Sequence, residues 1–305
     1  MAKYKIAWLP GDGVGNDVME AAKIVLDKLA LDAEYIHGDI GWEFWRTEAN
    51  PLPDRTIDLL KNTDCALLGA KTSKPKEEAE QEHIPEHQGK GKVNASPIVR
   101  LRQEFNLASN HRPCKAYPGH PLNYRDDIDI VVFRENTEDL YVGIEFHPFP
   151  DEIRDVVKKN HKKMARFDST SGDDMAVSLR INTRNGCRNI VTAAFEYAKK
   201  HGYKTVTVVE KPNVIRETSG LMIRTAREVA RNYPGIELWE TNIDAMCMWL
   251  VKNPQDYGVL ATSNMFGDIV SDLCAQLVGG LGFASSGNIG DNYAVFEPTH
   301  GLSLI

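Results

Sequence analysis

Short apolar runs alternate with segments of helical periodicity along the chain, and this alternation restricts the fold more than any other feature. Residues 5–10 predict a buried strand, residues 11–15 a glycine turn, and from residue 17 apolar side chains recur at helical spacing. Further strands are predicted at 64–69, 129–133 and 205–209, and helices at 188–201 and 219–232. The pattern predicts an α/β fold.

Composition excludes several other classes of protein. The chain has 305 residues, enough for two domains or one large α/β unit. Hydrophobic residues at 42% and charged residues at 26% exclude collagen-like and disordered chains. The net charge of -7 argues against a nucleic-acid partner. No apolar run reaches the roughly 18 residues of a membrane span, so no membrane association is expected.

The cysteines indicate a reducing compartment. Their number is odd and no C-x-x-C pair occurs among Cys65, Cys114, Cys187, Cys247 and Cys274. This usage is typical of free thiols, and we expect a cytoplasmic protein.

Two stretches interrupt the alternation. Residues 71–92 are highly charged and predict an exposed loop or a loosely held helix, either a solvated insertion or a segment beside a functional site. Residues 147–174 contain two prolines, a basic run and a polar run, and they predict a protruding segment.

The glycine loop after the first strand does not have the Rossmann spacing. Gly11, Gly13 and Gly15 are spaced G-x-G-x-G, whereas the Rossmann fingerprint has its third glycine one residue later. A tight turn that needs positive φ and a ligand-binding loop explain these glycines equally well.

Four arginines are candidates for binding an anion. Arg100, Arg102, Arg112 and Arg134 lie in a chain of net negative charge, and guanidinium groups recognise carboxylates and phosphates in a bidentate manner. Convergence of several in one cleft would bind a small polyanion. Each one taken alone could equally be an ordinary surface charge.

Asp268 and Asp272 are candidate metal ligands. If their segment is helical, the two carboxylates are four residues apart and therefore adjacent on one face. Their apolar neighbours favour a partly buried site for Mg²⁺ or Mn²⁺, which prefer oxygen ligands. The alternative is a helix N-cap at Asp268 and a solvated Asp272.

Two predicted strands end in residues that could move protons. The strand at 129–133 leads into a polar run that includes Tyr141, and the strand at 205–209 is followed by Lys211. Loops at strand ends carry function in α/β sheets. Lys211 beside a metal or arginines would be suited to act as a general base, and otherwise it is an ordinary exposed lysine.

Nine blocks of sequence form a specific set when taken together: 9–15, 101–104, 112–113, 133–141, 211–213, 244–245, 267–272, 288–290 and 297–301. Through these blocks the chain resembles the β-decarboxylating dehydrogenases, the isocitrate and isopropylmalate dehydrogenase family, along nearly its whole length. The resemblance is strongest to the NAD-type isocitrate and the homoisocitrate dehydrogenases.

The resemblance implies an isopropylmalate dehydrogenase-like α/β fold rather than a Rossmann fold. Residues 1–107 and 279–305 would form a large domain whose C-terminal part is incomplete. Residues 108–278 would form a smaller domain with a dimer arm near 147–185. The active site would lie between the domains of a homodimer and would be shared by the two subunits.

The resemblance also implies roles for individual residues. Asp268 and Asp272 would hold Mg²⁺ or Mn²⁺ together with Asp244 of the partner subunit, which would also contribute Lys211 as the base. Tyr141 would be the proton donor. Substrate carboxylates would be bound by Ser96, Arg102, Arg112 and Arg134. The nicotinamide cofactor would be bound by Thr72, Asn288, Glu297, His300 and Gly301.

The substrate is expected to be isocitrate first and homoisocitrate second. Ser96 is present, but Ile98 stands where bacterial isocitrate enzymes have asparagine, and the acid followed by paired leucines of the isopropylmalate enzymes is absent. NAD is preferred and NADP stays open, since the discriminating residues would follow the end of this chain. The alternative from another class is a non-catalytic regulatory subunit of a hetero-oligomeric relative.

Overall fold

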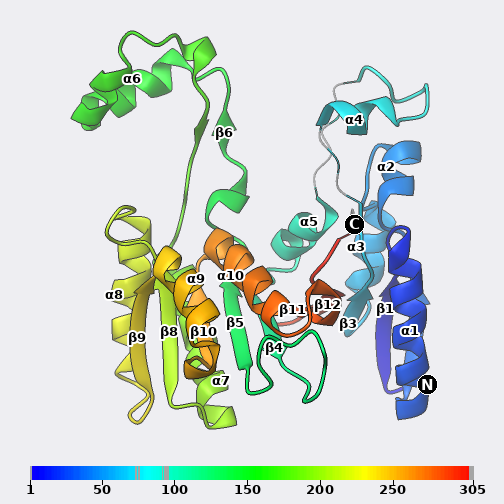
Figure 1. Ribbon diagram of the computed structural model, residues 1–305. Helices are drawn as coiled ribbons and strands as arrows, with labels where there is room; N and C mark the ends of the chain where they lie inside the picture. Colours follow the sequence, from blue (N-terminus) through cyan, green and yellow to red (C-terminus); the bar gives the residue numbers. More distant parts are fainter. Residues whose placement is uncertain (1, 73, 75, 91, 93–95, 302–305) are drawn as a thin grey trace.

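The computed structural model describes residues 2–72, 74, 76–90, 92 and 96–301. Its centre is one ten-stranded sheet with the order β2-β1-β3-β12-β11-β4-β5-β10-β8-β9 (Figure 1). The strands are β1 Tyr4–Leu9, β2 Ala33–His37, β3 Cys65–Leu68, β4 Ser109–Lys115, β5 Asp129–Glu135, β8 Thr205–Glu210, β9 Glu237–Asn242, β10 Val259–Thr262, β11 Ser285–Ile289 and β12 Ala294–Pro298.

Most neighbouring strands are parallel, and the exceptions lie in the middle of the sheet. Strand β11 is antiparallel to β12 and β4, and β4 is antiparallel to β5. The helices are α1 Val14–Leu29, α2 Trp42–Glu48, α3 Asp54–Leu60, α4 Lys76–Gln81, α5 Pro97–Glu104, α6 Asp151–Asn160, α7 Arg184–His201, α8 Thr218–Ala230, α9 Ile243–Lys252 and α10 Asn264–Leu277. The α/β class predicted from the sequence is confirmed.

Side chains that alternate along the strands build separate cores. Val131 and Phe133 of β5 face a cluster made with α7 and α8, whereas Ile130 and Val132 face the opposite cluster made with α9 and α10. A third cluster packs the β1 and β3 half of the sheet, from Ala7 to Val295. The sheet itself is continuous across these cores, and the division into two domains stays a prediction.

The glycine loop packs directly against the end of β3. Gly11 and Gly13 have φ of 76° and 45°, which favour glycine. The amide of Asp12 donates to the carbonyl of Ala70 at 2.8 Å. A Cβ on Gly15 would lie 2.3 Å from the carbonyl oxygen of Pro10. The backbone geometry of the turn therefore requires these glycines.

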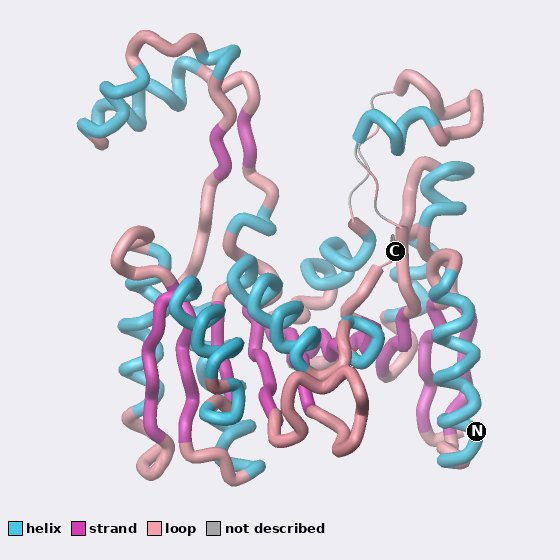
Figure 2. Tube along the Cα trace, viewed as in Figure 1, coloured by secondary structure: helices cyan, strands magenta, loops and turns pink. Residues whose placement is uncertain are grey.

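The two predicted irregular segments have different structures. Within 71–92 the described residues form α4 and turns that cover α2, where the indole of Trp45 donates to the carbonyl of Ala79 at 2.9 Å. Residues 73, 75 and 91, part of this prediction, lie outside the described residues. Residues 147–174 project from the body of the molecule, as Figure 2 shows. This arm contains α6, and its neck is the strand pair β6 (Glu145–Phe146) and β7 (Val177–Ser178).

No helix in the described part of the chain is long and apolar enough to cross a membrane. All five cysteines are free thiols.

The close approach at Gly15 makes a testable prediction. Gly15→Ala should lower the free energy of unfolding by about 2 kcal/mol, because its methyl group would overlap two backbone carbonyls that cannot move independently. Urea denaturation measures the change. Gly282→Ala is the control, since a Cβ there meets no atom within 4 Å. Equal stability of the two variants would contradict this account of the loop.

Candidate functional site

Three of the four candidate arginines converge from different elements. Arg102 lies on α5, Arg112 on β4 and Arg134 on β5, with 5%, 5% and 1% of their surfaces exposed. The register of β4 and β5 pairs Arg112 with Val132, so Arg112 and Arg134 are diagonal neighbours on one sheet face. The convergence that the residue types suggested is therefore present.

Arg100 does not take part in this cluster. Its guanidinium donates to the carbonyl of Leu52 at 2.8 Å and pairs with Asp54 at 2.9 Å. The side chain is partly exposed and fastens α5 to the chain before α3. The surface-charge interpretation holds for this arginine.

Burial disfavours the charge of two of the three arginines. Burial, and after it the charge of Arg112, lowers the pKa of Arg134 to about 10. Burial also lowers the pKa of Arg102. The Nη2 atom of Arg134 is buried without a hydrogen-bond partner among the described residues. A buried guanidinium donor without a partner suits an anionic ligand.

Asp268 is the carboxylate at the centre of this cluster. Its Oδ1 accepts from Arg112 at 3.0 Å and from Arg134, and its Oδ2 accepts from the hydroxyl of Tyr141 at 2.5 Å. Burial alone would raise the pKa of Asp268, but Arg134 and Arg112 together bring it below its usual value.

Asp268 and Asp272 occupy successive turns of α10, as their spacing predicted. The helix begins at Asn264 with Ser263 at the N-cap, so the alternative interpretation of Asp268 as the cap is wrong. Asp272 lies at the edge of the cluster, 3.6 Å from Arg112. Burial, and after it the charge of Asp268, raises the pKa of Asp272, although Arg112 acts against this.

Tyr141 could act as a proton donor. It belongs to a 3-10 turn, Leu140–Val142, directly after the polar run that leaves β5. Burial and the hydrogen bond to Asp268 raise the pKa of the Tyr141 phenol. The guanidinium carbon of Arg134 lies 4.9 Å from the centre of its ring. The phenol is therefore protonated at neutral pH.

Asn288 joins the arginine cluster to β12. Its side chain is fully buried, and its Oδ1 accepts from Arg102 at 2.9 Å, from Asn110 at 2.7 Å and from Asn136 at 2.9 Å. Its Nδ2 donates to Glu297 at 2.9 Å. The Asn288 side chain, which was expected to contact a cofactor, thus makes its hydrogen bonds within the protein. Through its bond to Glu297 it would position that carboxylate for a cofactor.

The other candidate cofactor residues lie around Lys71. The Nζ of Lys71 is 3.4 Å from a carboxylate oxygen of Glu297, and a Cβ on Gly301 would lie 3.2 Å from the Lys71 carbonyl. Burial would raise the pKa of Glu297, but Lys71 and Arg102 lower it below its usual value. Sequence reasoning missed Lys71, whose position just after the strand at 64–69 was the available signal.

Thr72 and His300 complete this group. The amide of Thr72 donates to the carboxylate of Asp12 at 2.8 Å, which links it to the glycine loop. The Nδ1 of His300 lies 2.9 Å from the carbonyl oxygen of Gly301. Their contact with a cofactor stays a prediction.

Lys211 and Asp244 form a separate pair. Lys211 follows β8, Asp244 lies in the first turn of α9, and their charged atoms are 2.5 Å apart. Lys211 lowers the pKa of Asp244 by this hydrogen bond. Among the described residues no three His, Cys, Asp or Glu side chains of one chain could hold a metal ion. A metal site that uses Asp244 with Asp268 would therefore need a second subunit.

The start of α5 contains Ser96 and Ile98, two positions that bear on the substrate. Ser96 is the N-cap of α5, and its hydroxyl makes no capping bond to the helix. Ile98 is 5% exposed and packs in the core with Leu9 and Leu101. The helical periodicity thus turns inward the position where bacterial isocitrate enzymes have asparagine.

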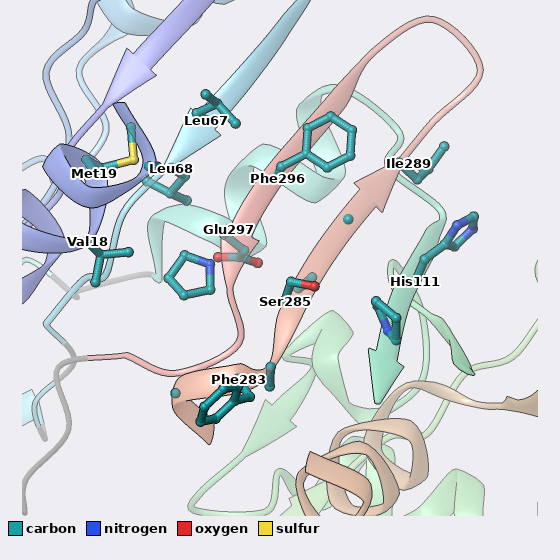
Figure 3. A pocket seen from close by; sticks show the side chains of 17 residues that line it. Val18, Met19, Leu67, Leu68, His111, Phe283, Ser285, Ile289, Phe296 and Glu297 are labelled. Atoms are coloured by element: carbon teal, nitrogen blue, oxygen red, sulfur yellow. The ribbon is translucent and has the colours of Figure 1, made fainter. Parts of the chain in front are cut away.

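An apolar cavity of about 540 Å³ meets this cluster at Glu297, which pairs with Arg102. Figure 3 shows it between α1, β3, β4 and the hairpin of β11 and β12, with Phe283 and Phe296 on its walls. Glu297 is its one acidic lining residue. Such walls do not suit a polyanion, so the candidate site remains the arginine cluster.

Removing the Asn288 side chain tests how the cluster is held. Asn288→Ala should lower the free energy of unfolding by about 3 kcal/mol, because the buried donors of Arg102, Asn110 and Asn136 lose an acceptor. Chemical denaturation measures this. Asn160→Ala, at an exposed helix position, should change stability by no more than about 0.5 kcal/mol. A loss of stability below about 1 kcal/mol for Asn288→Ala would show that the hydrogen bonds of Asn288 are not needed to hold the cluster.

The chain is similar to known proteins in both sequence and structure. Residues 5–303 match the family model described as "Isocitrate/isopropylmalate dehydrogenase". Protein DlpA of Legionella pneumophila is 38% identical over 97% of this chain, which spans only 47% of that protein. The 3-isopropylmalate dehydrogenase of Archaeoglobus fulgidus is 41% identical over 98% of this chain and 78% of its own length.

A solved structure of isocitrate dehydrogenase from Methylococcus capsulatus has a TM-score of 0.81 and 34% identity. The match covers 98% of this chain and 78% of that one. Both kinds of comparison agree with the architecture described above.

Proposed function

This chain belongs to the isocitrate/isopropylmalate dehydrogenase family, and on that premise we propose that it catalyses metal-dependent oxidative decarboxylation of a 2-hydroxy tricarboxylic acid with NAD or NADP. Isocitrate, which would give 2-oxoglutarate, is the first candidate substrate, and homoisocitrate is the second. The observation that carries the proposal is the convergence of three buried arginines on Asp268 and Tyr141.

The arginines would bind the substrate carboxylates. Arg134 offers a buried donor that no described side chain uses, and Arg102 and Arg112 lie close enough to influence its pKa. Bidentate guanidinium groups orient planar carboxylates as well as attract them. The hydroxyl of Ser96 makes no capping bond, and it could meet a third carboxylate.

The acidic residues fit a divalent cation. Two carboxylates on successive turns of α10 offer hard oxygen donors, and that of Asp272 is exposed at the edge of the cluster. A third ligand would be Asp244 of the partner subunit. When bound, Mg²⁺ or Mn²⁺ would supply Lewis-acid polarisation of substrate oxygens, and the nicotinamide would accept the hydride.

Protein side chains would move the protons. Lys211 of the partner subunit, through a water or a neighbouring acid, would help remove the proton of the substrate hydroxyl as the hydride leaves the same carbon. After carbon dioxide departs, Tyr141 would donate its phenolic proton to the carbon that carried the lost carboxylate. The raised pKa of Tyr141 keeps that proton available at neutral pH.

The cofactor would lie beside Thr72, Glu297, His300 and Gly301. Lys71 and Asn288 both contact Glu297 and fix its carboxylate. NAD is the preferred cofactor on the resemblance, with NADP as the alternative. The cytoplasmic location expected from the cysteines belongs to the same proposal.

A homodimer would complete the site. Exposed apolar side chains lie on α9 and α10 and beyond Lys211, namely Val214, Met248, Val251 and Ile269. Exposed apolar side chains on neighbouring elements are typical of an interface. Burial of these side chains by a second copy would bring its Lys211 and Asp244 toward Asp268.

Isopropylmalate is the competing substrate, because the Archaeoglobus fulgidus enzyme is 41% identical to this chain. Steady-state kcat/KM for isocitrate, homoisocitrate and isopropylmalate, with NAD and with NADP, decides between them. We expect turnover of both tricarboxylic acids, which differ by one methylene worth about 1–3 kcal/mol, and weak turnover of isopropylmalate. A preference for isopropylmalate would overturn the substrate assignment.

Two controls accompany this assay. EDTA should abolish turnover, and Asp272→Asn should lose Mg²⁺-dependent turnover while keeping the fold. Full activity of that variant in metal-free buffer would refute the metal assignment. Substrate binding without turnover of any of the three acids would favour the regulatory-subunit alternative.

Mixing two inactive variants tests the shared site. Lys211→Met chains and Tyr141→Phe chains should together regain about one quarter of the wild-type activity, because each hybrid dimer has one site with both native residues and random exchange makes half the dimers hybrid. Activity is measured after subunit exchange shown by mass-tagged chains. Absence of recovery despite exchange would place Lys211 in its own subunit's site.

A further inference from the structure

Beneath the candidate site, a buried ionic network centres on Arg180. Arg180 follows β7, the return strand of the arm's neck, and its side chain is 11% exposed. Its Nε donates to Asp139 at 2.5 Å, and its Nη2 donates to Ser263 at 2.7 Å and to Glu210 at 3.3 Å. The guanidinium also lies over the ring of Phe266 at 4.9 Å. The candidate roles assigned above do not include this residue.

Both carboxylates in this network also hold the beginning of α10. Asp139 is fully buried and its Oδ2 accepts from the amide of Met265 at 3.0 Å. Glu210 is fully buried and accepts from the amide of Ser263 at 3.1 Å. Carboxylates at a helix N-terminus satisfy free amides and the positive end of the helix dipole. Arg180 is the cation that pairs with both of them.

The same contacts fix both partners of the hydrogen bond between Tyr141 and Asp268. Asp139 lies two residues before Tyr141 and has φ of 73°, an unusual conformation for a non-glycine residue. Asp268 lies one turn beyond Met265 on α10. The link from Arg180 to Asp139 therefore determines how the phenol and the carboxylate face each other.

Lys211 is tied to the same network. Its amide donates to the hydroxyl of Ser219 at 3.3 Å, and that hydroxyl donates to Glu210 at 2.6 Å. Arg180 also donates to Ser219 at 3.3 Å. The turn that contains Lys211 is thus held by the same residues, Glu210 and Arg180, that hold the start of α10.

The arm reaches this network through its neck. The amide of Leu179 donates to the carbonyl of Ile144 at 2.9 Å, and the amide of Asp139 donates to the carbonyl of Ile181 at 2.7 Å. Residues 179–181 therefore run beside 139–144. In Figure 1 the neck descends from the arm toward α8 and α10. A displacement of the neck would move Arg180 directly.

We propose that Arg180 is a positioning residue that couples the arm to the proton-donor geometry of the site. Arg180 holds the turn that contains Tyr141 and the start of α10 in a fixed relative position. A shift of the neck would therefore change the contact between Tyr141 and Asp268. The expected effect of Arg180 on turnover rests on the proposed function. Its effect on the local structure rests on the contacts alone.

Kinetics of Arg180→Met test the proposal. We expect kcat for the substrate identified above to fall about 10-fold or more with KM within about 3-fold, because a misaligned proton donor impairs turnover while the three substrate-binding arginines remain. Arg180→Lys, which keeps the cation, should recover part of kcat. Arg184→Met is the matched control, since Arg184 is exposed and pairs with Glu228, and its kcat should stay at the wild-type value.

Hydrogen exchange measured by mass spectrometry gives a readout independent of activity. In Arg180→Met the amides of 139–142 and 263–268 should exchange about 10-fold faster, while those of β1 stay unchanged. If wild-type protein turns over none of the acids, the proposed function fails and this measurement still decides the role of Arg180.

Wild-type exchange in both segments, or a kcat equal to that of Arg184→Met, would overturn the proposal. A lower unfolding midpoint with unchanged kcat would also overturn it, because it would show a purely structural role. If Arg180→Met does not fold, Arg180→Lys carries the test, with kcat lowered at least about 3-fold at an unchanged midpoint. Wild-type kcat in Arg180→Lys would then reject the inference.

Discussion

The burial of three guanidinium groups side by side is the constraint on which much of this structure depends. Arg102, Arg112 and Arg134 repel one another, and each needs acceptors that water no longer supplies. The fold provides Asn288 beneath Arg102 and Asp268 against the other two. These acceptors come from β11 and α10, so the cluster can form only when distant parts of the chain have assembled.

The antiparallel strands in the middle of the sheet make this assembly possible. Strand β4 runs between β11 and β5, and it places Asn110 beside Asn288 on one side and beside Arg134 on the other. The parallel strands β5, β10 and β8 all end at the same edge, where Tyr141, α10 and Lys211 follow. A second layer of buried charge around Arg180 fixes these ends relative to one another.

The sequence predicted the residues that carry charge into the site, and it could not predict which contacts they make. Arg112 and Arg134 were candidates by residue type, and Asp268 and Asp272 by helical spacing, and all four lie in one cluster. Ile98 packs in the core, which the sequence did not predict, because the face that a short helix buries depends on what packs against it. Asn288 was expected at a cofactor surface, but its four-way hydrogen bonding is visible only when β4, β11 and β12 are adjacent.

What the sequence determined by itself is local: the alternation of strand and helix, the glycines that its turns require, and the i, i+4 placement of two carboxylates on α10. These follow from side-chain periodicity and backbone sterics within a few residues. Tertiary structure alone decided that Arg100 is a surface anchor while Arg102 is buried, and that Arg180 joins Asp139, Glu210 and Ser263 across 41, 30 and 83 positions of the chain. Buried charges are paired by the packing of whole helices and strands, and the spacing of residues in the sequence does not predict which of them become neighbours.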